Sequence, residues 1–214
     1  MRSFKIVLVI GGLGLAGVSL VQCGEDQPDD AGAPSSPLPI VTVDDQPAPA
    51  GWTPSDDPKT ARFLGLVAPK PVTWIEHPPS SKARVANYTV PGRDGSEAAH
   101  VVVSYFGRDQ GGTVDQNILR WQSQFKPDDD GTPQQPTVHR FEVDGMRVTL
   151  VELAGEWQKM GAQWYTPDQL FLSAIVEAPM GKVFIRFAGQ TATVQANRDA
   201  FMAMIRGLRR AEES

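Results

Sequence analysis

Three histidines are the residues best suited to metal binding or catalysis in this chain of 214 residues. His77, His100 and His139 lie far apart and lack the close spacing of a motif such as H-E-x-x-H. Alternation around His139 places it on one strand face with Phe141 and Val143, which favours a histidine at the edge of the core. We therefore expect no metal ion, no cofactor and no enzymatic activity. An envelope hydrolase or metal-dependent enzyme that uses these histidines is the alternative hypothesis.

A glycine pair in front of a predicted helix is a candidate anion site. Gly111 and Gly112 precede Thr113 in G-R-D-Q-G-G-T, and Arg108 could add charge. Backbone N–H groups at the start of a helix can hold an anion, but the Lys-Ser/Thr pair of a phosphate-binding loop is missing. The sequence therefore favours a structural role, in which the glycines permit a sharp turn and Thr113 forms a capping box with Gln116.

The same predicted helix carries a polar stripe that could bind a partner. Asn117, Arg120 and Gln124 share one face because residues three and four apart are neighbours on a helix. Asn117 and Arg120 could anchor a bound molecule, since arginine is common at recognition sites. We favour a structural network in which these side chains bind carbonyl groups of loops.

An aromatic segment, G-E-W-Q-K-M-G-A-Q-W-Y-T-P at 155–167, is the best place to look for a partner. Trp157, Met160, Trp164 and Tyr165 crowd a connection between two predicted hairpins, where polar residues are usual. Exposed aromatic residues there would anchor an envelope protein or a small-molecule ligand. The alternative, which we favour, is a lid that folds back over the edge of the sheet.

The N-terminus has the pattern of an export signal. Arg2 and Lys5 precede an uncharged apolar run of 16 residues, 6–21. That run is shorter than the roughly 20 residues of a membrane-spanning helix. We therefore expect residues 1–22 to be a signal peptide rather than a transmembrane helix.

Cys23 follows the apolar run and is the only cysteine, so it cannot form a disulfide within the chain. The segment L-V-Q-C at 20–23 resembles the lipobox of bacterial lipoproteins, in which the thiol is acylated and becomes the new N-terminus. Gln22 stands where the lipobox has a small residue, and cleavage nearer Ser19 with a free thiol is the alternative. The resemblance implies a lipid anchor in the bacterial cell envelope, on the periplasmic side of the outer membrane.

The next segment differs in composition from the rest of the chain. Residues 24–50 contain six prolines, six acidic residues and no Lys or Arg. Such a composition cannot bury enough apolar surface to offset its ordering entropy, so we expect residues 23–50 to be a disordered tether. Of the net charge of −5, residues 51–214 carry only −1. This balance argues against a nucleic-acid partner, and the length fits a single domain.

Two-residue periodicity dominates residues 51–214 and is interrupted by two helical patterns. We predict strands over 72–77, 84–90, 98–106, 170–178 and 183–188, and helices over 113–126 and 193–208. An Asp144-Gly145 turn predicts a tight hairpin. Its facing pairs would be Val143 with Met146, Phe141 with Val148, and Glu142 with Arg147, the last as a surface ion pair. A mostly antiparallel sheet flanked by helices is an α+β sandwich.

Two segments carry a family resemblance. R-V-A-N-Y-T-V-P-G at 84–92 and Y-F-G-R-D-Q-G-G-T-V-D-Q-N-I-L-R-W at 105–121 resemble uncharacterised bacterial envelope lipoproteins. The order of predicted elements resembles the PsbP/Mog-like α/β/α sandwich, a fold that implies docking modules more often than catalysts. We therefore expect a lipid-anchored envelope protein with a non-catalytic binding or adaptor domain.

Overall fold

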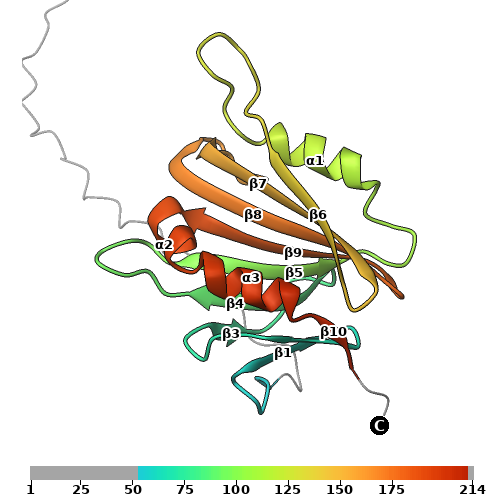
Figure 1. Cartoon of the computed structure of the whole chain (residues 1–214). Helices are drawn as coiled ribbons and strands as arrows, with labels where there is room; N and C mark the ends of the chain where they lie inside the picture. The colour runs from blue at the N-terminus through green and yellow to red at the C-terminus, as the bar shows by residue number, and fades with distance from the viewer. Residues whose placement is uncertain (1–52, 212–214) are drawn as a thin grey trace, which may run out of the picture. The chain divides into compact units, whose positions relative to one another are not determined.

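The computed structural model describes residues 53–211, which form two antiparallel sheets and three helices (Figure 1). The large sheet has the order β3 (Ile75–His77), β4 (Arg84–Val90), β5 (Ala99–Tyr105), β9 (Gly181–Gln190), β8 (Thr166–Ala178), β7 (Met146–Trp157), β6 (Thr137–Val143). The small sheet has the order β1 (Thr60–Phe63), β2 (Leu66–Pro69), β10 (Arg209–Arg210). The helices are α1 (Val114–Gln122), α2 (Thr191–Ala196) and α3 (Arg198–Arg206). This architecture confirms the predicted α+β class with a mostly antiparallel sheet flanked by helices.

The large sheet is covered on both faces. Helix α1 packs on one face through Trp121, over a cluster that includes Phe171 and Phe184. Helices α2 and α3 and the small sheet pack on the other face, over a larger apolar cluster. The interior strand β5 is accordingly buried on both sides at 101–103, where three valines follow one another.

The β6–β7 hairpin has the predicted register. Asp144 and Gly145 adopt positive φ angles of 49° and 70°, as a two-residue type I′ turn requires. The facing pairs are Val143 with Met146, Phe141 with Val148, and Glu142 with Arg147. The predicted ion pair between Glu142 and Arg147 is wrong, because Arg147 instead bonds Glu177 of β8 at 2.5 Å. Arg147 has a facing residue on both neighbouring strands, and a single-hairpin pattern cannot show which one it chooses.

The predicted C-terminal helix is two helices, α2 and α3, separated at Asn197. The side-chain amide of Asn197 donates to the backbone carbonyl of Thr193 at 2.9 Å. Asparagine competes in this way with the regular hydrogen bonds of a helix. Apolar residues that recur with helical spacing within 193–208 are nevertheless buried, at Val194, Phe201, Ile205 and Leu208.

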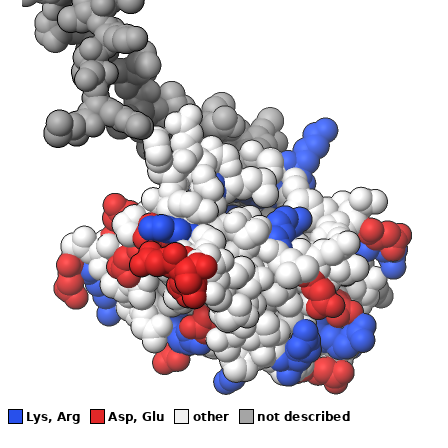
Figure 2. All heavy atoms as spheres, turned by 90° about the horizontal axis from the view of Figure 1, so that it is seen from above, with Lys and Arg blue, Asp and Glu red and all other residues white. Residues whose placement is uncertain are grey.

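The face seen in Figure 2 has mixed charge: Lys, Arg, Asp and Glu side chains are interspersed, with wide uncharged areas between them. Within residues 53–211, no helix is both long and apolar enough to cross a bilayer. The predicted signal peptide, Cys23 and the tether lie outside the described residues.

Candidate functional site

Among the strands of residues 53–211, β6 is an edge of the large sheet and has one neighbour, β7. In a two-residue hairpin, the residues on either side of the turn form a hydrogen-bonded pair, and here these residues are Val143 and Met146. Bonded and non-bonded pairs alternate along an antiparallel ladder. The backbone N–H and C=O groups that point away from β7 therefore belong to Val138, Arg140 and Glu142.

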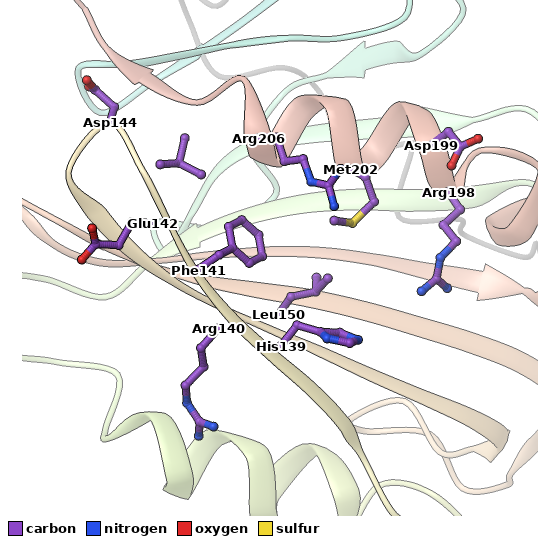
Figure 3. Close-up of a pocket in the computed structure, with 11 residues that line it drawn as sticks. His139, Arg140, Phe141, Glu142, Asp144, Leu150, Arg198, Asp199, Met202 and Arg206 are labelled. Carbon is purple, nitrogen blue, oxygen red and sulfur yellow. The ribbon is translucent and has the colours of Figure 1, made fainter.

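A groove of about 870 Å³ lies beside β6 on the α3 face of the sheet. Its apolar lining comes from Phe141 and Leu150 on the hairpin and from Met202 on α3 (Figure 3). His139 lies on the same side of β6 as Phe141, while Arg140 points to the opposite side, toward α1. The groove therefore combines an apolar wall with an unpaired strand edge.

Charged side chains of the groove come from α3 and from the hairpin turn. Arg198 donates to both carboxylate oxygens of Glu152, one at 2.9 Å, and these hydrogen bonds raise the pKa of Arg198. Asp144 accepts from the backbone N–H of Arg210 at 2.8 Å and from its side-chain Nε at 3.2 Å, which lowers the pKa of Asp144. These two pairs fix the groove walls, and Arg206 of α3 lies between them in the lining.

A second groove, of about 510 Å³, lies on the α1 face of the same strand. Most of its lining residues are polar, and they include Asp115 of α1, Arg140 and Glu142 of β6, and Arg147 of β7. Strand β6 is thus flanked by open space on both faces along its outer edge. This site could not be predicted from the sequence, because alternation indicates only a core position for Phe141 and does not show which strand ends the sheet.

The glycine pair has the structural role that the sequence favours. Thr113 and Gln116 form the predicted capping box, in which the Gln116 side chain accepts from the Thr113 backbone N–H at 2.9 Å. Gly111 has a φ of 87°, and a Cβ at this position would lie 2.9 Å from the Phe184 ring. Arg108 donates to the carbonyl of Pro179 at 3.1 Å, in the β8–β9 turn. The residues of the proposed anion cradle therefore serve the turn and the cap.

The polar stripe of α1 is the structural network that the sequence favours. Asn117 is 1% exposed, and its amide donates to the carbonyls of Gly111 and Thr113, each at 2.7 Å. Arg120 donates to the Asn117 side-chain oxygen. The side chain of Gln124 accepts from the Trp157 indole at 3.1 Å.

The aromatic segment divides into a buried part and an exposed part. Trp157 ends β7, is 6% exposed and stacks on Phe125, with the two rings 6.3 Å apart. Met160 and Trp164 are each 77% exposed, and Tyr165 is 38% exposed. The predicted lid is therefore wrong for the loop at 158–165, and the three exposed residues remain available for contact.

The three histidines are not brought together. His77 lies on β3 and His139 on β6, which are the two edges of the seven-stranded sheet, and His100 lies on the interior strand β5. His139 is exposed in the groove of Figure 3 rather than at the edge of the core. Across residues 53–211, no group of three His, Cys, Asp or Glu side chains is placed to hold a metal ion.

No family model matches this sequence, and no curated protein has a matching sequence. A solved structure that is similar to this chain is that of a protein of unknown function from Pseudomonas aeruginosa. The two sequences are 12% identical, and the TM-score is 0.47. The match covers 72% of this chain and 97% of that chain.

Proposed function

We propose that this protein is a lipid-anchored envelope adaptor whose domain binds an extended segment of another envelope protein by adding it as a strand to β6. The observation that carries this proposal is the unpaired edge of β6 with an open groove on each face. The leader and the lipobox-like Cys23 support the anchor. The separation of the histidines gives no support to the alternative of an enzyme that uses them together.

Strand addition uses main-chain hydrogen bonds for affinity and side-chain pockets for specificity. Successive side chains of an added strand would point to opposite faces of the sheet. On the α3 face they would meet Phe141 and Met202, which favour apolar groups. On the α1 face they would meet Arg140 and Glu142, which favour polar groups. The bound segment is therefore expected to alternate apolar and polar residues.

A matched pair of substitutions tests the outer edge of β6. Arg140→Pro removes an outward N–H without removing a β6–β7 hydrogen bond, and proline is tolerated on edge strands. Arg140→Ala removes the side chain and keeps the N–H. We expect Arg140→Pro to weaken binding of a selected peptide by about tenfold, because the Arg140 N–H is lost and a carbonyl group of the peptide is left without a donor. Arg140→Ala should stay within a few-fold of the unchanged protein.

The peptide comes from a displayed library of alternating apolar and polar heptamers, and calorimetry gives its affinity for the full chain. Amide hydrogen exchange then locates it: the amides of Val138, Arg140 and Glu142 should gain protection. The amides of His139 and Phe141 already face β7 and should change little. Protection elsewhere, equal affinity of both Arg140 variants, or a library without a binder contradicts strand addition. Dimerisation that is lost with Arg140→Pro would instead assign the edge to a second copy of the chain.

A further inference from the structure

A small cavity lies between α1 and the large sheet, on the face opposite to the groove of Figure 3. Its volume is about 110 Å³, which is enough for one small polar group but not for a drug-sized molecule. The lining comes from β5 and α1 and the residues that follow them, from β8 and β9, and from the 158–165 loop. The lining residues that matter here are Phe106, Arg120, Met160, Ser173 and Arg186. The described residues that line it include two arginines and no carboxylate.

Arg186 is the central cation of this cavity. It lies on β9 and has its guanidinium 5.8 Å from the centre of the Trp157 ring. It takes part in none of the ion pairs and side-chain hydrogen bonds found within residues 53–211. Within these residues, the half-buried guanidinium of Arg186 contacts the face of the Trp157 ring, but its N–H groups have no side-chain acceptor.

Other cations surround Arg186 and increase the cost of its charge. Burial, together with the nearby charge of Arg84, lowers the pKa of Arg186 to about 10. The pKa of Lys159 is also lowered, first by burial and then by the charges of Arg186 and Arg84, although much of the Lys159 side chain is exposed. Like charges without a counter-charge disfavour one another, so a bound anion would stabilise all three.

Ser173 supplies a second, independent sign of a missing ligand. It is fully buried, and its hydroxyl has no hydrogen-bond partner. It lies directly across from Arg186 in the β8–β9 register, so the two side chains share one face and are neighbours. Buried hydroxyl groups normally have a partner. A donor without an acceptor and an arginine without a carboxylate thus line the same small cavity.

We propose that this cavity binds the oxyanion group of a small molecule, a carboxylate or a phosphate, through Arg186 and Ser173, with Arg84, Lys159 and Arg120 supplying further positive charge. Guanidinium groups match the two oxygens of such groups with paired hydrogen bonds. Phe106 and Met160 are 47% and 77% exposed beside the cavity, so the rest of the ligand would contact an apolar rim. This site lies outside the β6 edge and does not depend on strand addition there.

Titration calorimetry of the full chain in detergent, at constant ionic strength, tests the site with inorganic phosphate and with acetate as probes. We expect saturable binding of at least one probe, and the tighter of the two assigns the phosphate or the carboxylate class. Arg186→Gln should weaken that binding by about tenfold or more, because it removes charge-assisted hydrogen bonds. Arg62→Gln makes the same charge change at an exposed position of β1 and should leave the affinity within about twofold.

Ser173→Ala provides a variant that keeps every charge and removes only the buried hydroxyl. It should weaken the same probe several-fold, whereas a purely electrostatic effect of the cations would leave the affinity unchanged. Arg140→Pro should bind the probe like the unchanged protein, which separates this site from the β6 edge. Absence of saturable binding for both probes, or equal affinity of Arg186→Gln and Arg62→Gln, would overturn the proposal.

Discussion

At the scale of single residues, Asn117 shows how a buried amide sets the start of a helix. Its side chain bonds the carbonyls of Gly111 and Thr113, on the turn before α1, and accepts from Arg120 within the helix. An isolated polar group at 1% exposure would be costly, but here both ends of the amide have partners. The sharp turn and the helix are thereby held together by one side chain.

We predict that Asn117→Ala destabilises the domain by about 1–3 kcal/mol, because it removes the three hydrogen bonds of a buried side chain and takes from the Gly111 carbonyl its Asn117 donor. Urea unfolding followed by tryptophan fluorescence measures this change, since Trp121 lies on the same helix. Leu119→Ala is the matched control: Leu119 is 63% exposed on α1, and its loss should cost less than about 0.5 kcal/mol. Equal losses in the two variants would contradict the network.

At the scale of elements, the hairpin turn also connects the two sheets. Asp144 accepts from the backbone and the side chain of Arg210, and Arg210 lies on β10 of the small sheet. Because both hydrogen bonds favour the charged carboxylate, the pKa of Asp144 is lowered below its usual 3.8. The connection should therefore be present above pH 3.8 and be lost as the pH falls through the lower pKa of the folded state.

We predict that the amide resonance of Arg210 titrates with a midpoint below 3.8, which NMR spectroscopy of the full chain in detergent can measure. Arg210→Gln removes the side-chain donor and should move the midpoint of Asp144 upward. Asp144→Asn should abolish the titration of the Arg210 amide. A midpoint at or above 3.8 in the unchanged protein would show that Arg210 does not hold the carboxylate.

Elements with local signals could be predicted from the sequence, and elements set by distant contacts could not. Asp144-Gly145 fixed the register of β6 and β7, and the Thr113 cap marked the start of α1. The small sheet was missed because β1 and β2 have four residues each and β10 has two, so periodicity has too little length to act on. The β1–β2 turn also places Leu64 at a positive φ of 52°. Asn or Asp is the usual residue at such a position, so Leu64 gives no sign of a turn.

The two candidate sites could not be predicted for a related reason. Arg84, Lys159 and Arg186 lie on β4, a loop and β9, and only the sheet order brings their charges together. Arg186 sits in an alternating strand pattern that indicates only an outward-facing residue. The β6 edge likewise depends on the pairing of the whole sheet, because each strand of a hairpin looks equally able to be internal.

At the scale of the whole molecule, the proposed anchor depends on Cys23, which lies outside the described residues. We predict that the chain expressed in bacteria incorporates a clickable palmitate analogue and fractionates with membranes. Cys23→Ser should remove the label completely, because no other cysteine is present. Gln22→Ala, which restores a small residue before the cysteine, should keep the label. A labelled Cys23→Ser protein or an unlabelled, soluble parent protein would reject the anchor.

The first and last strands of the described chain, β1 and β10, both belong to the small sheet. Strands β1 and β10 both pair with β2, so the chain enters and leaves through the small sheet, which packs on the face of the large sheet opposite to α1 (Figure 1). A C-terminal affinity tag would therefore hold the protein on a sensor chip from the same side as an N-terminal attachment. The cavity beneath α1 lies on the opposite face of the large sheet and would then face the flowing analyte.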